Sequence, residues 1–218
     1  VDNGGRFAAG IMAVKVPIDS AEGRFAMGFF VDDAGDLEPM GLAGLDEQSI
    51  TLATRHFSDF IVVAIDKLEL PERITTGFTP GVDDWHFANR GSLLEPGGHC
   101  ARQCLAAAWY YYERKLRGRG SLRKRSDNNG SNPTPDLWQD DSHGYRLCSA
   151  VQHDVDWTVL DEAYDLSNLS QERTWRAFLY AMHLTGEPQM MGVYDTDKGG
   201  GHALLAWSAE PEKGILYV

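Results

Sequence analysis

The chain has 218 residues, of which 43% are hydrophobic and 11% aromatic, which allows one good core or two small ones. A formal net charge of -12 argues against a general affinity for nucleic acid or for anionic membranes. The longest apolar runs have the length of a strand, well short of the ~20 residues that span a bilayer. We therefore expect two modest domains, no membrane span and no nucleic-acid partner.

Three cysteines, an odd number, do not indicate a disulfide framework, so at least one thiol should be free. The first residues have neither the basic region nor the apolar stretch of a signal peptide, and they lack an initiator Met. We therefore expect a processed or shortened form of a longer protein.

The first seventy residues are typical of strands. Residues 6–18 and 24–31 are rich in apolar residues, and residues 49–65 alternate and then become continuously apolar. We expect a β-rich, sandwich-like domain over residues 1–70. His56 and Ser58 lie in this part, and we expect them to have a packing or turn role.

Residues 71–96 contain Gly and Pro too often for a long regular element, and we expect a linker that approaches the second domain. From Cys100 to residue 116 the sequence is rich in Ala, Leu and aromatic residues, which predicts a buried helix starting at or just before Cys100. Residues 114–125 hold seven basic residues, and residues 126–135 are typical of a mobile loop. We favour a solvated loop here over a basic patch that recruits an acidic partner.

Further along, residues 160–164 and 170–184 are predicted to be helical, the second with Ser170 as its cap and Glu172 in its first turn. Residues 189–194, 203–208 and 214–218 are predicted strands, separated by turn sequences. We expect an α+β second domain over residues 97–218.

The stretch Gly97-Gly98-His99-Cys100 places a cysteine where a glycine-rich loop enters a helix. A helix N-terminus has unpaired amides and partial positive charge, which favour a thiolate and can bind the oxyanion of a tetrahedral intermediate. Glycines at this point let a substrate backbone approach closely. Cys100 is therefore a candidate nucleophile.

About a hundred residues later, His202 follows a run of glycines and begins a predicted buried strand. From the start of such a strand, an imidazole can reach a thiol on a facing helix and act as its general base. We therefore pair His202 with Cys100.

The order Cys then His, the Gly-Gly-x-Cys helix start and the Gly-His-Ala-Leu-Leu strand resemble papain-like cysteine peptidases. The resemblance covers roughly residues 78–218 and is strongest to the bacterial branch that includes the peptidases processing double-glycine leader peptides. It implies a thiol protease with Cys100 as nucleophile, His202 as base, a peptide or protein substrate and no cofactor. It leaves the oligomeric state open.

Residues 49–60 resemble, more weakly, the closing strands of β-sandwich modules in bacterial surface proteins. With the first resemblance, this implies a secreted or cell-surface protein rather than a cytoplasmic one.

The sequence departs from the family pattern at two positions. The family usually has Gln six residues before the nucleophile as an oxyanion donor, where this chain has Leu94; Asn89 is the nearest upstream amide, and Gln103 is less suitable. The family also orients its histidine with Asn or Asp on a following strand. Here Glu210 and Glu212 fall in a turn, which leaves Asp195 or a residue after Val218.

Several other interpretations remain. Cys104 is expected to pack inward, and His99 to form a wall or surface residue. The spacings in the sets Cys100, Cys104, His99, His202 and His143, Cys148, His153 do not favour zinc, so we expect no metal. The alternatives to a peptidase are a transglutaminase-like acyl transferase and a non-catalytic papain-like binding module.

Overall fold

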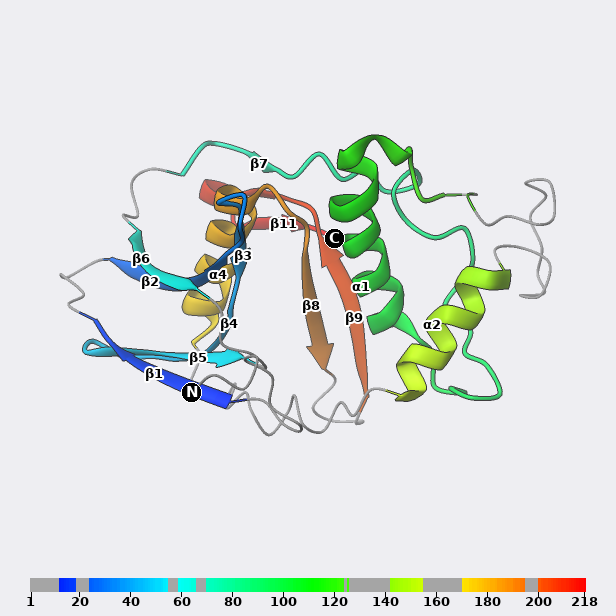
Figure 1. Cartoon of the computed structure of the whole chain (residues 1–218), viewed down its shortest axis with the longest axis horizontal. Helices are drawn as coiled ribbons and strands as arrows, with labels where there is room; N and C mark the ends of the chain where they lie inside the picture. Colours follow the sequence, from blue (N-terminus) through cyan, green and yellow to red (C-terminus); the bar gives the residue numbers. More distant parts are fainter. Residues whose placement is uncertain are drawn as a thin grey trace. The chain divides into compact units, whose positions relative to one another are not determined.

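A computed structural model describes residues 12–18, 24–54, 59–65, 70–123, 125, 142–154, 170–194 and 200–218. In these parts the chain combines α-helices with small antiparallel sheets, so it belongs to the α+β class (Figure 1). Several predictions lie outside the described residues: the loop 126–135, the helix 160–164, His56 with Ser58, and Asp195.

The chain divides into two compact units. Unit 1 comprises Val1–Ile74, Asp156–Gly186 and Glu210–Lys213; unit 2 comprises Thr75–Val155, Glu187–Ala209 and Gly214–Val218. The expected domain 97–218 placed the helix 170–184 with the candidate site, whereas in the structure this helix joins the N-terminal strands. The expected linker 71–96 falls almost entirely within unit 2.

Unit 1 contains two three-stranded antiparallel sheets. The first has the order β1-β5-β4 and the second the order β3-β2-β6. The strands are β1 (Met12–Pro17), β2 (Phe25–Val31), β3 (Leu37–Pro39), β4 (Gly41–Leu45), β5 (Ser49–Thr54) and β6 (Phe60–Ile65). The predicted strands 24–31 and 49–65 are thus present, the latter as two strands, β5 and β6.

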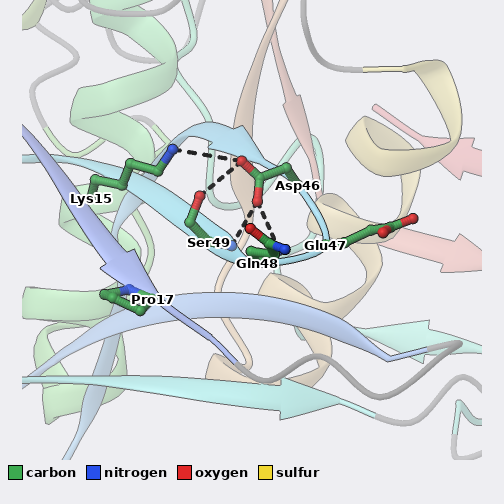
Figure 2. Close-up of a pocket in the computed structure, with 6 residues that line it drawn as sticks. All are labelled: Lys15, Pro17, Asp46, Glu47, Gln48 and Ser49. Carbon is green, nitrogen blue, oxygen red and sulfur yellow. Dashed lines mark hydrogen bonds and ion pairs between the residues drawn. The ribbon is translucent and has the colours of Figure 1, made fainter.

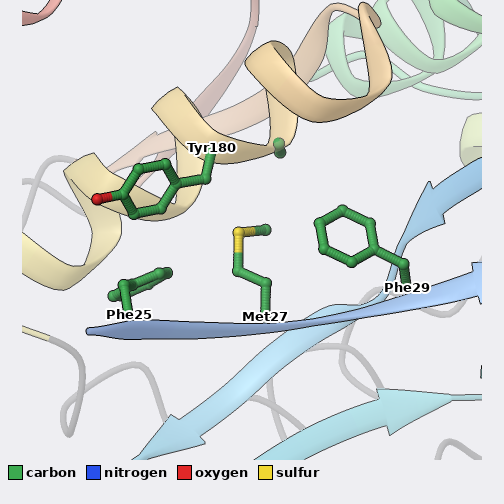
Figure 3. Close-up of a cluster of buried hydrophobic side chains, with 5 residues drawn as sticks. Phe25, Met27, Phe29 and Tyr180 are labelled. Atoms are coloured by element: carbon green, nitrogen blue, oxygen red, sulfur yellow. The ribbon is translucent and has the colours of Figure 1, made fainter. Parts of the chain in front are cut away.

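Strand β2 has buried side chains on both of its faces. Phe25, Met27 and Phe29 project together and pack against Tyr180 of helix α4 (Gln171–Thr185), as Figure 3 shows. Ala26 belongs to a separate cluster with Ile50 and other residues of the neighbouring sheet. Because side chains alternate along a strand, β2 serves as the middle layer between α4 and β5.

Helix α4 begins and ends as its sequence predicts. Ser170 adopts an extended conformation, and its hydroxyl accepts a hydrogen bond from the Arg173 N–H at 3.2 Å. Gly186 closes the helix in the left-handed region at φ 69°. Both ends satisfy backbone groups that a helix leaves unpaired.

Unit 2 is built around helix α1 (Cys100–Tyr110) and the antiparallel pair β8 (Gln189–Tyr194) and β9 (Gly201–Ala206). Helix α2 (Ser142–Asp154) packs closely where Gly144 meets Trp85, since a Cβ on Gly144 would lie 2.3 Å from the indole. The remaining strands form a sheet of order β11-β10-β7: β7 (Ile74–Thr75), β10 (Ser208–Glu210) and β11 (Ile215–Tyr217). Ile74, Glu210 and the short 3-10 helix η4 (Pro211–Lys213) belong to unit 1.

The predicted helix from Cys100 to residue 116 is an α-helix only as far as Tyr110. From there η2 (Tyr111–Arg119) has π-helical turns and a kink at Arg117 and Gly118. Basic side chains of this region have intramolecular partners. Lys115 pairs with buried Asp83 at 2.5 Å, and Arg123 pairs with Asp84 at 2.8 Å. These pairs lower the charge that is available to an acidic partner.

No helix within the described ranges is both long enough and apolar enough to cross a membrane.

Gly28 of β2 provides a test of the packing in unit 1. A Cβ at this position would lie 2.4 Å from a methyl group of Leu52, which is fully buried. Overpacking of this kind should make Gly28→Ala lower the free energy of unfolding by about 1–3 kcal/mol, measured by urea denaturation.

Gly44→Ala is the matched control, because the new Cβ would meet Thr51 at an ordinary 3.5 Å. It should change stability by less than about 0.5 kcal/mol. Equal losses in the two variants would contradict the packing of β2 on β5.

Candidate active site

Helix α1 begins at Cys100, directly after a glycine turn. Gly98 has φ 107°, a conformation that favours glycine, and the first helical hydrogen bond runs from the Gln103 N–H to the His99 carbonyl at 3.0 Å. The N-cap residue, His99, makes no side-chain capping hydrogen bond. The amides of the first helical turn have no intrahelical acceptor, so the positive end of α1 lies at Cys100.

The sulfur of Cys100 contacts the strand that carries His202. The Ala203 N–H donates a hydrogen bond to Cys100 Sγ over 3.4 Å. His202 directly precedes Ala203 in β9, and its side chain is exposed. The fold therefore brings Cys100 to the residue next to His202, although Cys100 and Ala203 are 103 positions apart in the chain.

An apolar cluster fixes the helix against this strand. Phe78, Ala107, Tyr111 and Leu122 are buried together, and Leu205 packs against them. Since side chains alternate along β9, Ala203 shares the face of Leu205, while His202 lies on the opposite face. The sulfur therefore contacts the main chain at Ala203, and the side chain of His202 starts from the face opposite Leu205.

The other two thiols differ from Cys100 in their surroundings. Burial raises the pKa of Cys104 to about 12, with a further contribution from Cys100. Burial likewise raises the pKa of Cys148, on α2, to about 12, and only 1% of this residue is exposed. Both stay protonated at neutral pH and are poor nucleophiles. In the described part of the chain, no three His, Cys, Asp or Glu side chains are grouped as metal ligands would be.

Asn89 lies against the turn that precedes the helix. Its Oδ1 accepts the His99 N–H at 2.7 Å. A Cβ on Gly98 would lie 2.8 Å from Oδ1 and 3.1 Å from Nδ2 of Asn89, so the carboxamide covers this glycine. Asn89 thus lies beside the turn that leads to Cys100, and its oxygen is engaged with that turn.

The two other positions considered for the oxyanion donor have different environments. The amide of Gln103 hydrogen-bonds to His99 Nδ1 at 3.1 Å, which commits this side chain to the turn. Leu94 is 54% exposed and carries no donor.

His99 is fully buried, whereas the sequence suggested a wall or surface position. Its ring stands edge-to-face with Phe87 and Tyr145, at centroid distances of 5.8 and 5.0 Å. Burial lowers the pKa of His99, and the imidazole is accordingly neutral in the folded protein. The sequence did not predict this burial, because Phe87 lies in the expected linker and Tyr145 is distant in the chain.

The last strand differs from expectation. β11 pairs with β10 and not with β9, and just beyond β9 the Trp207 N–H donates to the Tyr217 carbonyl at 3.0 Å, with the two rings 5.7 Å apart. The described strands after His202 thus place no Asn or Asp beside its ring.

A separate open pocket lies in unit 1, with a volume of about 510 Å³ (Figure 2). Its lining residues are Lys15, Pro17, Asp46, Glu47, Gln48 and Ser49. Asp46 accepts hydrogen bonds from the backbone N–H groups of Gln48 and Ser49 at 2.8 and 2.7 Å, and these bonds lower its pKa. The carboxylate therefore closes the β4–β5 turn, a structural role.

The chain matches no protein-family model and has no significant match among curated proteins or solved structures. A functional assignment consequently depends on the geometry of the Cys100 region.

The neutral state of His99 predicts a pH-dependent stability. The ordinary pKa of histidine is 6.5, and that of His99 is lower in the folded chain. As the pH falls below about 6.5, the unfolded chain binds a proton that the folded chain resists, so stability is complete above this pH and declines below it.

Urea denaturation between pH 7 and pH 5 measures this effect. The decline should be shallower in His99→Gln, which cannot titrate, even if that variant is less stable at every pH. Parallel curves for the two proteins would show that His99 is not the titrating group.

Proposed function

We propose that unit 2 is a thiol-dependent hydrolase that cleaves a peptide or amide bond, with an arrangement similar to that of papain-like cysteine peptidases. The supporting observation is the hydrogen bond from the Ala203 N–H to Cys100 Sγ at 3.4 Å, beside the exposed His202. This contact brings the candidate nucleophile, at the start of a helix, to the residue that follows the candidate base, at the start of a strand.

In the proposed reaction, His202 takes the proton of the Cys100 thiol, and the thiolate attacks the carbonyl carbon of the substrate. The tetrahedral oxyanion is stabilised by the positive end of α1, including the Cys100 amide. Collapse breaks the C–N bond, and His202 gives its proton to the leaving amine. Water then attacks the thioester with His202 as base, which releases the acid and restores the thiol.

A non-catalytic binding module is the second candidate, and one observation favours it. The resemblance calls for an amide donor at the position of Leu94, which has none, and Gln103 is engaged with His99. In a binding module Cys100 would have no need of His202, so the behaviour of its thiol separates the two functions. Capture of a labelled amine in place of water would identify the acyl-transferase variant.

Alkylation by iodoacetamide tests the proposal. At pH 7, Cys100 should be labelled first, since the pKa values of about 12 keep Cys104 and Cys148 protonated. His202→Ala should slow the labelling of Cys100 by about tenfold or more, because it removes the base that accepts the thiol proton. Peptide mapping by mass spectrometry identifies the labelled residue.

Cys104→Ser is the matched control, one helical turn away, and it should leave the rate at Cys100 within about twofold. Equal rates for wild type and His202→Ala would reject the Cys–His pair and favour the binding module.

A further inference from the structure

The turn before Cys100 is tied down at its backbone and at its side chain. Asn89 Oδ1 holds the His99 N–H at 2.7 Å, and Gln103 Nε2 meets His99 Nδ1 at 3.1 Å. The His99 ring, fully buried, is wedged edge-to-face against Phe87 and Tyr145. Three separate segments thus fix the residue that precedes the candidate nucleophile.

These contacts around His99, called the clamp below, differ from an ordinary helix cap. An ordinary N-cap side chain accepts a hydrogen bond from the second or third helical N–H, which would occupy the positive end of the helix. Asn89 instead bonds to the N–H of His99, the cap residue itself, and His99 makes no side-chain capping bond. The clamp therefore orders the turn without a side-chain cap from His99.

Gly98 shows how closely the clamp fits. It has φ 107°, and a Cβ there would lie 2.8 Å from Asn89 Oδ1. Gly97, one residue earlier, has nothing within 4 Å of its Cβ position. A methyl group should therefore disturb the clamp at residue 98 but not at residue 97.

We propose that Asn89 is a positioning residue, acting through its Oδ1 on His99 to set the position of the Cys100 sulfur, rather than an oxyanion donor acting through Nδ2. The inference rests on the proposed hydrolase function, but the clamp itself is a property of the fold. It assigns Asn89 a role distinct from the amide donor that the family resemblance suggested.

Amide hydrogen exchange tests the clamp without reference to activity. Asn89→Ala and Gly98→Ala should speed exchange of the His99 N–H by about 5- to 30-fold, the range that follows from losing one such hydrogen bond. Asn89→Asp keeps an acceptor oxygen, and Gly97→Ala leaves the turn untouched, so both should retain protection. Unchanged exchange in Asn89→Ala would overturn the clamp.

Two rates at Cys100 then separate positioning from oxyanion stabilisation. Alkylation by iodoacetamide forms no oxyanion, whereas acylation by p-nitrophenyl acetate does, so the ratio of acylation to alkylation cancels any change in thiolate content. The proposal expects both rates to fall in Asn89→Ala and Gly98→Ala, with the ratio unchanged in all variants. Gly97→Ala should match the wild type in its alkylation rate.

The alternative outcome is equally clear. If Asn89 donates to the oxyanion, the ratio should fall by about 10²–10³ in Asn89→Ala and in Asn89→Asp, which lacks the amide donor, but not in Gly98→Ala. That pattern would overturn the positioning role. A third outcome separates the two proposals. If Cys100 of the wild type is alkylated no faster than Cys100 of His202→Ala, while Asn89→Ala still speeds exchange of the His99 N–H, the hydrolase proposal fails and the clamp stands as a structural feature.

Discussion

The burial of α1 against β9 is the contact on which the candidate site depends. Leu205 of the strand packs on the apolar side of the helix, including Ala107 and Tyr111. Burial of such side chains contributes about 1.5–3 kcal/mol each, far more than the weak hydrogen bond between the Ala203 N–H and the Cys100 sulfur. The apolar contacts therefore fix the helix, and the polar contact at its first residue follows from where they place it.

Buried polar groups hold the segment that leads to α1. Asp83, 1% exposed, pairs with Lys115 at 2.5 Å and accepts the Thr79 N–H at 2.9 Å. The Tyr111 hydroxyl donates to the Thr76 carbonyl at 2.7 Å. Breaking a buried ion pair by removing one partner typically costs about 3–5 kcal/mol, so these bonds anchor residues 76–83 on the helix. Asn89 extends from this anchored segment toward the Gly98 turn.

Local patterns predicted individual elements well, and tertiary contacts decided the rest. The start of α1 at Cys100, the cap at Ser170 and the strand Gln189–Tyr194 follow from short-range signals such as glycines, capping residues and apolar periodicity. The partner of α4 could not be predicted, because an apolar helix face does not specify which sheet it covers. His99 was misplaced for the same reason, since its burial depends on residues that no local pattern connects to it.

The starts of helices α1 and α4 differ in a way that bears on the candidate site. Helix α4, which has no proposed chemistry, is capped by Ser170, the ordinary solution for unpaired amides. Helix α1 has a buried histidine at the same position and no side-chain cap, although replacing a good cap typically costs about 1 kcal/mol. The positive end of a helix can bind a substrate oxygen as its charge develops. In α1 this end lies at the residue whose sulfur contacts the neighbour of His202, where His99 supplies no side-chain cap that would compete for it.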